Sequence, residues 1–201
     1  GQDVTWRRYV IHKAQLPIDG TLLDIATGTG EIALEGQALV PGLQAVGGDF
    51  TVEMMQVGRQ IPARQAIRWV GADTLALPFP DNYFDVISIA FGLRNVTHID
   101  QALQSMYRVL KPGGQLLVLE FSKANAPGLS PIYDMYSFKI LPVIGKMVAN
   151  DEKSYRYLAE SIRMHPDQET LKAMMEEAGF DRCEFHNLTG GIVALHRGFK
   201  Y

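Results

Sequence analysis

Residues 22–33 read LLDIATGTGEIA, and this stretch passes from an apolar segment through a glycine-rich turn into a helical pattern. Its apolar start has the composition of a buried strand, and the spacing Gly28-x-Gly30-x-x-Ala33 follows directly. Glycines at these positions let a backbone approach a ligand closely at the start of the next helix. The stretch therefore predicts a strand–turn–helix unit that holds a nucleoside-bearing ligand.

The rest of the chain alternates short apolar segments with helical patterns, which is typical of a doubly wound, Rossmann-like sheet. We expect strands at residues 21–26, 43–47, 67–70, 84–90 and 115–121, and helices at residues 31–40, 52–60, 99–110 and 167–178. Residues 180–187 and 192–199 flank the turn Thr189-Gly190-Gly191 and predict a closing antiparallel hairpin. The expected fold is a single α/β domain over residues 1–201, with a mostly parallel sheet of seven strands.

Residues 122–165 interrupt this alternation with aromatic, methionine and proline residues that show no strand period. We expect an inserted helical lid there. Its apolar stretch from Ile132 to Val148 could either pack on the sheet or form a channel for an apolar ligand. Residues 1–9 have the pattern of a helix interior and no initiator methionine, so we expect that chain upstream of Gly1 is missing.

Composition limits the classes of function. The 201 residues carry a formal net charge of −3 without a long basic run, so we expect no binding to nucleic acid. Cys183 is the only cysteine, which excludes a disulfide framework and a cysteine-based zinc site, and we expect no metal. No apolar run reaches the roughly 18 residues that span a bilayer. The expected location is cytoplasmic; peripheral contact with the inner face of the cytoplasmic membrane and a homodimer both stay open.

Three acids at strand ends indicate which ligand the glycine turn holds. Asp24 precedes the turn, and Asp49 and Asp73 follow the second and third expected strands. The glycines and a ribose-binding Asp49 occur in dehydrogenases and in methyltransferases, and an isolated acid can also cap a helix. Asp24 would repel a pyrophosphate but attract the ammonium of a methionine moiety, and Asp73 can accept from an adenine amino group. Together with the closing hairpin, these acids favour S-adenosyl-L-methionine as the cofactor.

Longer motifs extend this pattern along nearly the whole chain: D-x-x-TGTG from residue 24, GDFT-x-x-MM from residue 48, GAD-x-x-x-LPF-x-D-x-x-FD from residue 71, FGLRN from residue 91, RVLKPGG from residue 108, EFS from residue 120 and YL-x-ESI from residue 157. The first three resemble motifs of class I S-adenosylmethionine-dependent methyltransferases. The last four resemble the ubiquinone/menaquinone biosynthesis C-methyltransferase family. The resemblance implies methylation of a polyprenyl quinol ring, either demethylmenaquinol or a 2-methoxy-6-polyprenyl-1,4-benzoquinol.

The resemblance also implies a set of site residues. Cofactor-binding residues are expected to be Asp24, Thr27, Gly28, Thr29, Gly30, Asp49, Phe50, Met54, Asp73, Thr74 and Ala90. Substrate-binding residues are expected to be Phe91, Arg94, Asn95, Tyr136 and His165. Relatives often carry a serine where this chain has Ala90, so only the backbone could contact the cofactor there. The Tyr-Asp pair of the family's N-terminal stretch has no match in this chain.

The implied chemistry needs an ionised quinol, because a phenolate delocalises its charge onto the ring carbon beside it. A phenol has a pKa of about 10, so a base or a fixed cation must assist. We expect Arg94 to stabilise the quinol oxygen and Asn95 to orient it, as the catalytic residues. Alternatively, Arg94 pairs with a carboxylate such as Asp85 or Asp100. His165 is a further candidate base.

Two other functions stay open: a methyltransferase for a different small molecule, and a non-catalytic regulator that binds S-adenosylmethionine. Retention of Asp49, Asp73, Arg94 and Asn95 favours an enzyme over a regulator. The combination of FGLRN with YLAESI favours a quinol over another acceptor.

Overall fold

The computed structural model describes residues 2–123 and 151–201. The strands are β1 (Thr21–Ile25), β2 (Gln44–Asp49), β3 (Arg68–Gly71), β4 (Phe84–Ala90), β5 (Leu110–Phe121), β6 (Asp181–Leu188) and β7 (Val193–Phe199). The α-helices are α1 (Gln2–Ala14), α2 (Glu31–Leu39), α3 (Val52–Arg59), α4 (Ile99–Val109), α7 (Glu152–Met164) and α8 (Gln168–Glu177). Short 3-10 turns form η1 (Pro62–Arg64), η2 (Leu93–Asn95) and η4 (Thr189–Gly191).

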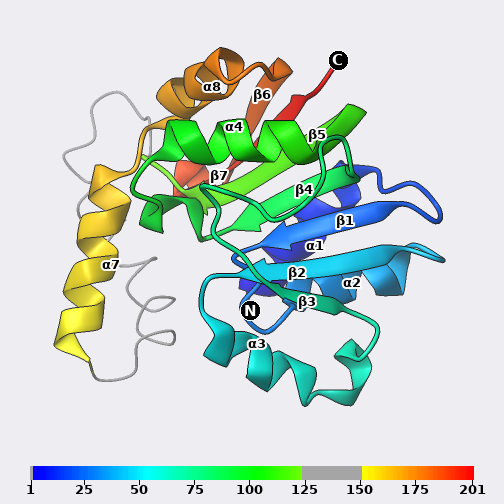
Figure 1. The fold of residues 1–201 in the computed structure, drawn as a ribbon. Coiled ribbons are helices and arrows are strands. Elements are labelled where there is room, and N and C mark those ends of the chain that lie inside the picture. The colour runs from blue at the N-terminus through cyan, green and yellow to red at the C-terminus, as the bar shows by residue number, and fades with distance from the viewer. Residues whose placement is uncertain (1, 124–150) are drawn as a thin grey trace.

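The described strands form a seven-stranded sheet with the order β3-β2-β1-β4-β5-β7-β6 (Figure 1). Strands β1 to β5 pair in parallel, whereas β7 runs antiparallel to both β5 and β6. The expected doubly wound sheet and its closing hairpin are therefore confirmed. Because the strand order reverses between β1 and β4, a ligand crevice is expected at their carboxyl ends.

Helices cover both faces of the sheet, as expected for central strands with continuous apolar sequence. On one face, α4 and α8 pack Met106 and Met175 into a core that includes Leu23. On the other face, α1, α2 and α7 pack into a second core that includes Leu22. The two leucines point to opposite faces because side chains alternate along a strand. Figure 1 shows α4 and α8 on one side of the sheet and α1 and α2 on the other.

One element boundary differs notably from the sequence expectation. The strand expected at residues 115–121 begins at Leu110, where α4 has just ended. Leu110 pairs with Phe84, and the next pair joins Gln115 to Val86, so the KPGG part of the RVLKPGG motif forms a bulge inside the strand. Pro112 and the left-handed Gly113, with φ of 84°, interrupt the ladder without ending the strand.

The expected helical insertion lies only partly within the described residues. Helix α7 belongs to it, and its N-cap Asp151 accepts a hydrogen bond from the Lys153 amide at 3.0 Å. Leu158 and Ile162 anchor this helix in the second core. Tyr136 and the stretch from Ile132 to Val148 lie outside the described residues. Across residues 2–123 and 151–201, no helix combines the length and apolar character needed to cross a membrane.

Candidate active site

The glycine-rich turn joins β1 to α2 and has a fixed backbone shape. Gly28 and Gly30 have φ of 58° and 87°, in the left-handed region that favours glycine. A Cβ at Gly30 would lie 2.6 Å from the Trp69 ring, so a side chain cannot fit there. A Cβ at Gly28 would meet only the Met54 methyl group, at 3.9 Å. The second glycine therefore serves packing, while the first leaves room for a ligand.

Asp24 lies behind this turn and ties it to the neighbouring strand. Its side chain accepts hydrogen bonds from the Thr27 hydroxyl and from the Ser88 hydroxyl on β4, both at 2.8 Å. Burial raises the pKa of Asp24 to about 6, and the two hydroxyl bonds oppose that rise. The structure thus gives this carboxylate a supporting role in the turn. Its direct contact with a methionine ammonium, which the sequence suggested, stays a prediction.

Asp49 and Asp73 follow neighbouring strands at the same edge of the sheet. The Asp49 carboxylate accepts hydrogen bonds from the amides of Gly28 and Thr51, both at 2.8 Å. Asp73 is exposed just beyond β3 and accepts from the Leu75 amide at 2.9 Å. A carboxylate on the Gly28 amide would repel a pyrophosphate at the turn. The acids instead suit a ligand with ribose and amino donors and a positive charge, which describes S-adenosylmethionine.

Apolar side chains beside the turn support the same fit. Phe50, just before α3, and Met54, in its first turn, are 80% and 45% exposed, although large apolar groups are usually buried. An adenosyl group lying over Gly28 would cover them. The Thr29 hydroxyl donates to Glu31 at 2.9 Å, so its proton is used within the protein. Thr74, next to Asp73, is half-buried.

Arg64, which the sequence analysis missed, holds the turn from its other side. Its guanidinium donates to the Thr29 carbonyl at 2.9 Å and to the Glu31 carboxylate at 2.7 Å. Arg64 is 8% exposed and lies in η1, between α3 and β3. Nothing in the surrounding stretch, IPARQA, marks the arginine as buried or names its partners. Its role becomes visible only when the turn and η1 are placed side by side.

The FGLRN segment leaves β4 in a tight turn that leads into η2. Phe91 has φ of 55°, which is uncommon for a residue other than glycine and stores backbone strain. Its ring packs against Trp6 and Phe121, with centroids 5.8 and 4.9 Å away. A Cβ at Gly92 would lie 2.4 Å from the Cβ of Ala26, at the end of β1. The FGLRN turn is therefore packed directly against the glycine-rich turn, with half-buried Ala90 leading into it.

Arg94 is ion-paired, but with a carboxylate that the sequence analysis did not consider. Its Nη1 lies 3.0 Å from Glu120 Oε1 and also donates to the Phe91 carbonyl at 2.6 Å. The two charged side chains are 8% and 2% exposed. The suggested partners Asp85 and Asp100 do not take this role. The EFS motif, which contains Glu120, was the available signal.

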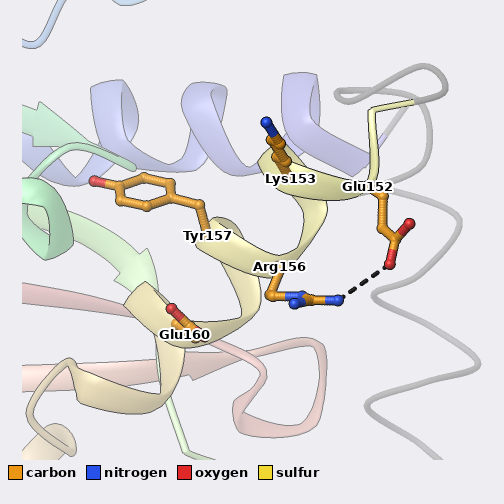
Figure 2. Close-up of a pocket in the computed structure, with 5 residues that line it drawn as sticks. All are labelled: Glu152, Lys153, Arg156, Tyr157 and Glu160. Carbon is orange, nitrogen blue, oxygen red and sulfur yellow. Dashed lines mark hydrogen bonds and ion pairs between the residues drawn. The ribbon is translucent and has the colours of Figure 1, made fainter.

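Asn95 connects the turn to helix α7. Its Oδ1 accepts a hydrogen bond from the Tyr157 hydroxyl at 3.0 Å, so the FGLRN and YL-x-ESI motifs meet in space. Tyr157 also lines a pocket of about 370 Å³ with Glu152, Lys153, Arg156 and Glu160. In Figure 2, Tyr157 points away from the Arg156–Glu152 ion pair on the same helix.

His165 and His196 are buried, and His165 is within electrostatic range of both His196 and Arg94. His165 caps the end of α7, and His196 lies on β7, where its Nε2 donates to the Gln168 carbonyl at 2.8 Å. Within the described part of the chain, both Nδ1 atoms are buried without a hydrogen-bond partner. Burial lowers the pKa of each histidine to about 4; the charges of His196 and Arg94 further lower that of His165. The structure therefore brings His165 toward Arg94, as a neutral imidazole. No group of three or more potential metal-ligating side chains is present in residues 2–123 and 151–201.

Acidification from about pH 6.5 to pH 4 is expected to lower the free energy of unfolding. The unfolded chain protonates His165 and His196 near pH 6.5, whereas the folded protein does so only near pH 4. Their contribution to the free energy of unfolding is thus complete above the unfolded-state pKa of 6.5, and it is lost as the pH falls from there through the folded-state pKa of about 4. The loss is on the order of 3 kcal/mol for each histidine. The raised pKa of Asp24 acts in the opposite direction between about 4 and 6 and offsets part of it.

Urea unfolding across this pH range would measure the effect in the wild type and in His196→Gln. The glutamine can still donate to the Gln168 carbonyl but does not titrate, so the pH dependence should flatten. His12→Gln, at an exposed position on α1, is the matched control. An unchanged pH dependence in His196→Gln would show that His196 does not contribute to the loss of stability at low pH.

The strand order and the acids at the strand ends define an S-adenosylmethionine-dependent methyltransferase of class I. Solved structures share this fold. Phosphoethanolamine N-methyltransferase 2 of Haemonchus contortus, in complex with S-adenosyl-L-methionine, matches with a TM-score of 0.73 and 15% identity over 98% of this chain and 52% of that one. A SAM-dependent methyltransferase of Aquifex aeolicus matches with a TM-score of 0.70 and 16% identity over 97% and 89%.

The chain belongs to the ubiE/COQ5 methyltransferase family, whose sequence model matches residues 1–200. It is 57% identical to the ubiquinone/menaquinone biosynthesis C-methyltransferase UbiE of Pseudomonas aeruginosa, over 97% of this chain and 78% of the relative. It is 56% identical to the UbiE protein of Marinomonas sp., over 98% and 80%. The family expected from the motifs, its enzyme class and its cofactor are thereby confirmed.

Proposed function

We propose that this chain transfers a methyl group from S-adenosylmethionine to a ring carbon of a polyprenyl quinol in menaquinone or ubiquinone biosynthesis. The observation that carries the proposal is the contact between the cofactor turn and the FGLRN turn, where Gly92 packs on Ala26. A substrate held by FGLRN would therefore lie next to the cofactor. The names of the UbiE relatives support a quinol as the acceptor. Demethylmenaquinol and the methoxy-benzoquinol are both included.

The proposed cofactor site uses the half-buried Asp49, the exposed Asp73 and the apolar surface beside the glycine turn. Bound S-adenosylmethionine supplies an electrophilic methyl group on its sulfonium. Asp49 accepts hydrogen bonds from the ribose hydroxyls, since the amides of Gly28 and Thr51 already hold its carboxylate in place. Asp73 accepts from the adenine amino group. Phe50 and Met54 cover the adenosyl rings, and Ala90 contributes its backbone.

The proposed substrate site is built around Arg94 and Asn95. Arg94 remains protonated and stabilises the phenolate form of the quinol, directly or through a water. Its Nη1 is occupied by Glu120 and Phe91 and its Nε is buried, so a quinol oxygen is taken by the Nη2 protons. The exposed Asn95 orients the same oxygen. Phe91 and His165 complete the site among the described residues, and Tyr136, which lies outside them, stays a candidate substrate contact.

The polyprenyl tail of such a substrate belongs in a bilayer, so we also propose peripheral contact with the cytoplasmic membrane. Support comes from α7, where Tyr155, Tyr157 and Met164 are 38%, 59% and 84% exposed. Sedimentation with vesicles that contain or lack anionic lipid measures this contact, and failure to bind either would exclude it. The same membrane contact is compatible with a monomer and with a homodimer.

Two measurements on the full-length protein test the function. Titration calorimetry with S-adenosylmethionine is expected to show binding, and incubation with short-chain demethylmenaquinol or the benzoquinol is expected to give methylated product. Binding without turnover on either quinol would favour a regulator. Quinone profiling by mass spectrometry in a strain that lacks the gene would show which demethylated quinone accumulates. Normal quinones in that strain would favour a different small-molecule acceptor.

A further inference from the structure

The Glu120 carboxylate accepts hydrogen bonds from both the backbone amide and the side chain of Arg94. Glu120 Oε1 accepts from Arg94 Nη1 at 3.0 Å and from the Phe121 amide at 2.8 Å, and Oε2 accepts from the Arg94 amide at 3.3 Å. The carboxylate is 2% exposed at the end of β5. It thus reaches across from one strand to fix the turn that follows the neighbouring strand β4.

This pair is poorly explained as a stability device. A buried ion pair loses its hydration, and apolar residues of similar volume are often as stable or more so. The Arg94 guanidinium also lies 5.5 Å from the centre of the Phe121 ring, so an aromatic side chain, and not water, lies beside the cation. Burial raises the pKa of Glu120, although the Arg94 charge opposes that rise. The free energy of folding therefore gives little reason for two charges at this place.

The hydrogen bonds do determine the conformation of the FGLRN turn. Arg94 Nη1 bridges Glu120 and the Phe91 carbonyl, so the arginine side chain folds back over the turn that carries it. Phe91, with φ of 55°, needs such surroundings to keep its strained backbone. Asn95 follows directly, and its position depends on the same turn. Glu120 is the acidic side chain that connects these contacts.

We propose that Glu120 is a positioning residue for methyl transfer: it orients the Arg94 guanidinium toward the quinol and holds the FGLRN turn in its strained form. The inference rests on the proposed role of Arg94 in the substrate site. Glu120 itself does not contact the quinol. It acts by leaving Arg94 a single orientation, in which Nη1 is held by the protein and Nε is buried, so that Nη2 is the donor left for the substrate. The Glu120 charge also balances the arginine, so the pair is neutral before the phenolate forms.

The test compares Glu120→Gln with Arg94→Lys and with the double variant that carries both substitutions. The glutamine keeps the shape and one acceptor but removes the charge that orients Arg94. We expect kcat to fall about 10- to 100-fold in Glu120→Gln, while the Kd for S-adenosylmethionine stays within about twofold. We expect Arg94→Lys to lower kcat as well, because lysine lacks the fork geometry. In the double variant, adding Glu120→Gln to Arg94→Lys should then change kcat by less than about threefold.

Glu184→Gln is the matched control, since it breaks the ion pair with Arg197 in the same sheet, between β6 and β7. It should leave kcat unchanged. Glu120→Asp keeps the charge and serves as a second variant if the glutamine fails to fold; because its carboxylate is retracted by one methylene, kcat should again fall while cofactor binding remains.

The outcomes separate the inference from the proposed function. Wild-type kcat in a folded Glu120 variant, with loss of turnover in Arg94→Lys, would overturn the positioning role alone. Effects that multiply in the double variant would also overturn it, since Glu120 would then act independently of Arg94. Wild-type kcat in Arg94→Lys and in Arg94→Ala would remove the proposed role of Arg94 and the inference with it. Equal losses of kcat and cofactor binding would reduce Glu120 to a structural residue.

Discussion

Replacement of Arg94 by alanine is expected to lower kcat for quinol methylation by about 100- to 1000-fold, the usual effect of losing a charge that stabilises an oxyanion. The Kd for S-adenosylmethionine should stay close to the wild-type value, because the proposed side-chain contacts to the cofactor come from the ends of β1, β2 and β3, and Ala90 contributes only its backbone. Turnover measured with a short-chain demethylquinol, and binding measured by calorimetry, check both parts of the prediction.

The alanine variant also removes the partner of a buried charge, which complicates its stability. An unpaired Glu120 would cost about 3–5 kcal/mol of unfolding free energy. The double variant Arg94→Ala/Glu120→Gln has no charge at either position, so it should recover part of that stability without recovering turnover. Arg108→Ala is a control, since Arg108 donates to two carbonyls and to Asp81, away from the FGLRN turn. Wild-type turnover in Arg94→Ala would refute the proposed catalytic role.

Replacement of Asp49 by alanine is expected to weaken S-adenosylmethionine binding by about 100- to 10,000-fold. Hydrogen bonds to a charged group contribute about 1.5–3 kcal/mol each, and two ribose hydroxyls would lose their acceptor. The glycine turn would also lose the carboxylate that accepts from the Gly28 amide at 2.8 Å. Titration calorimetry gives the change in Kd, and thermal unfolding shows whether the variant is folded.

Two further variants, Asp73→Ala and Asp81→Ala, show whether the loss of affinity is specific to Asp49. Asp73 is proposed to bind one adenine donor, so its loss should weaken binding by about tenfold. Asp81 pairs with Arg108 at 2.9 Å and has no proposed ligand contact, so its loss should leave the Kd unchanged. Nearly wild-type affinity in a folded Asp49→Ala protein would contradict the ribose assignment. A larger loss of affinity in Asp73→Ala than in Asp49→Ala would indicate that the main contact to the cofactor is at its adenine end.

Much of the fold and part of the candidate site follow from local sequence. The apolar runs around Leu23 and Ile87 predict strands, because the local composition and the spacing of apolar residues determine which segments can be buried in a sheet. Strand ends then place Asp49 and Asp73 at one edge, since parallel strands have their carboxyl ends on the same side. The hairpin at residues 180–199 is predictable in the same way, from two extended segments around glycines. The family's motifs were sufficient to identify the cofactor and the enzyme class.

The partners of the charged residues were decided by the tertiary structure alone. The sequence suggests Asp85 or Asp100 as the partner of Arg94. The actual partner is Glu120, because β4 and β5 pair in the sheet and bring the ends of the two strands together. The Asp24 carboxylate accepts a hydrogen bond from Ser88 because β1 pairs with β4 and places the two residues opposite each other. Arg64 gave no signal in the sequence. A local pattern specifies the type and exposure of an element, whereas a side-chain contact depends on which distant elements become neighbours and in what register.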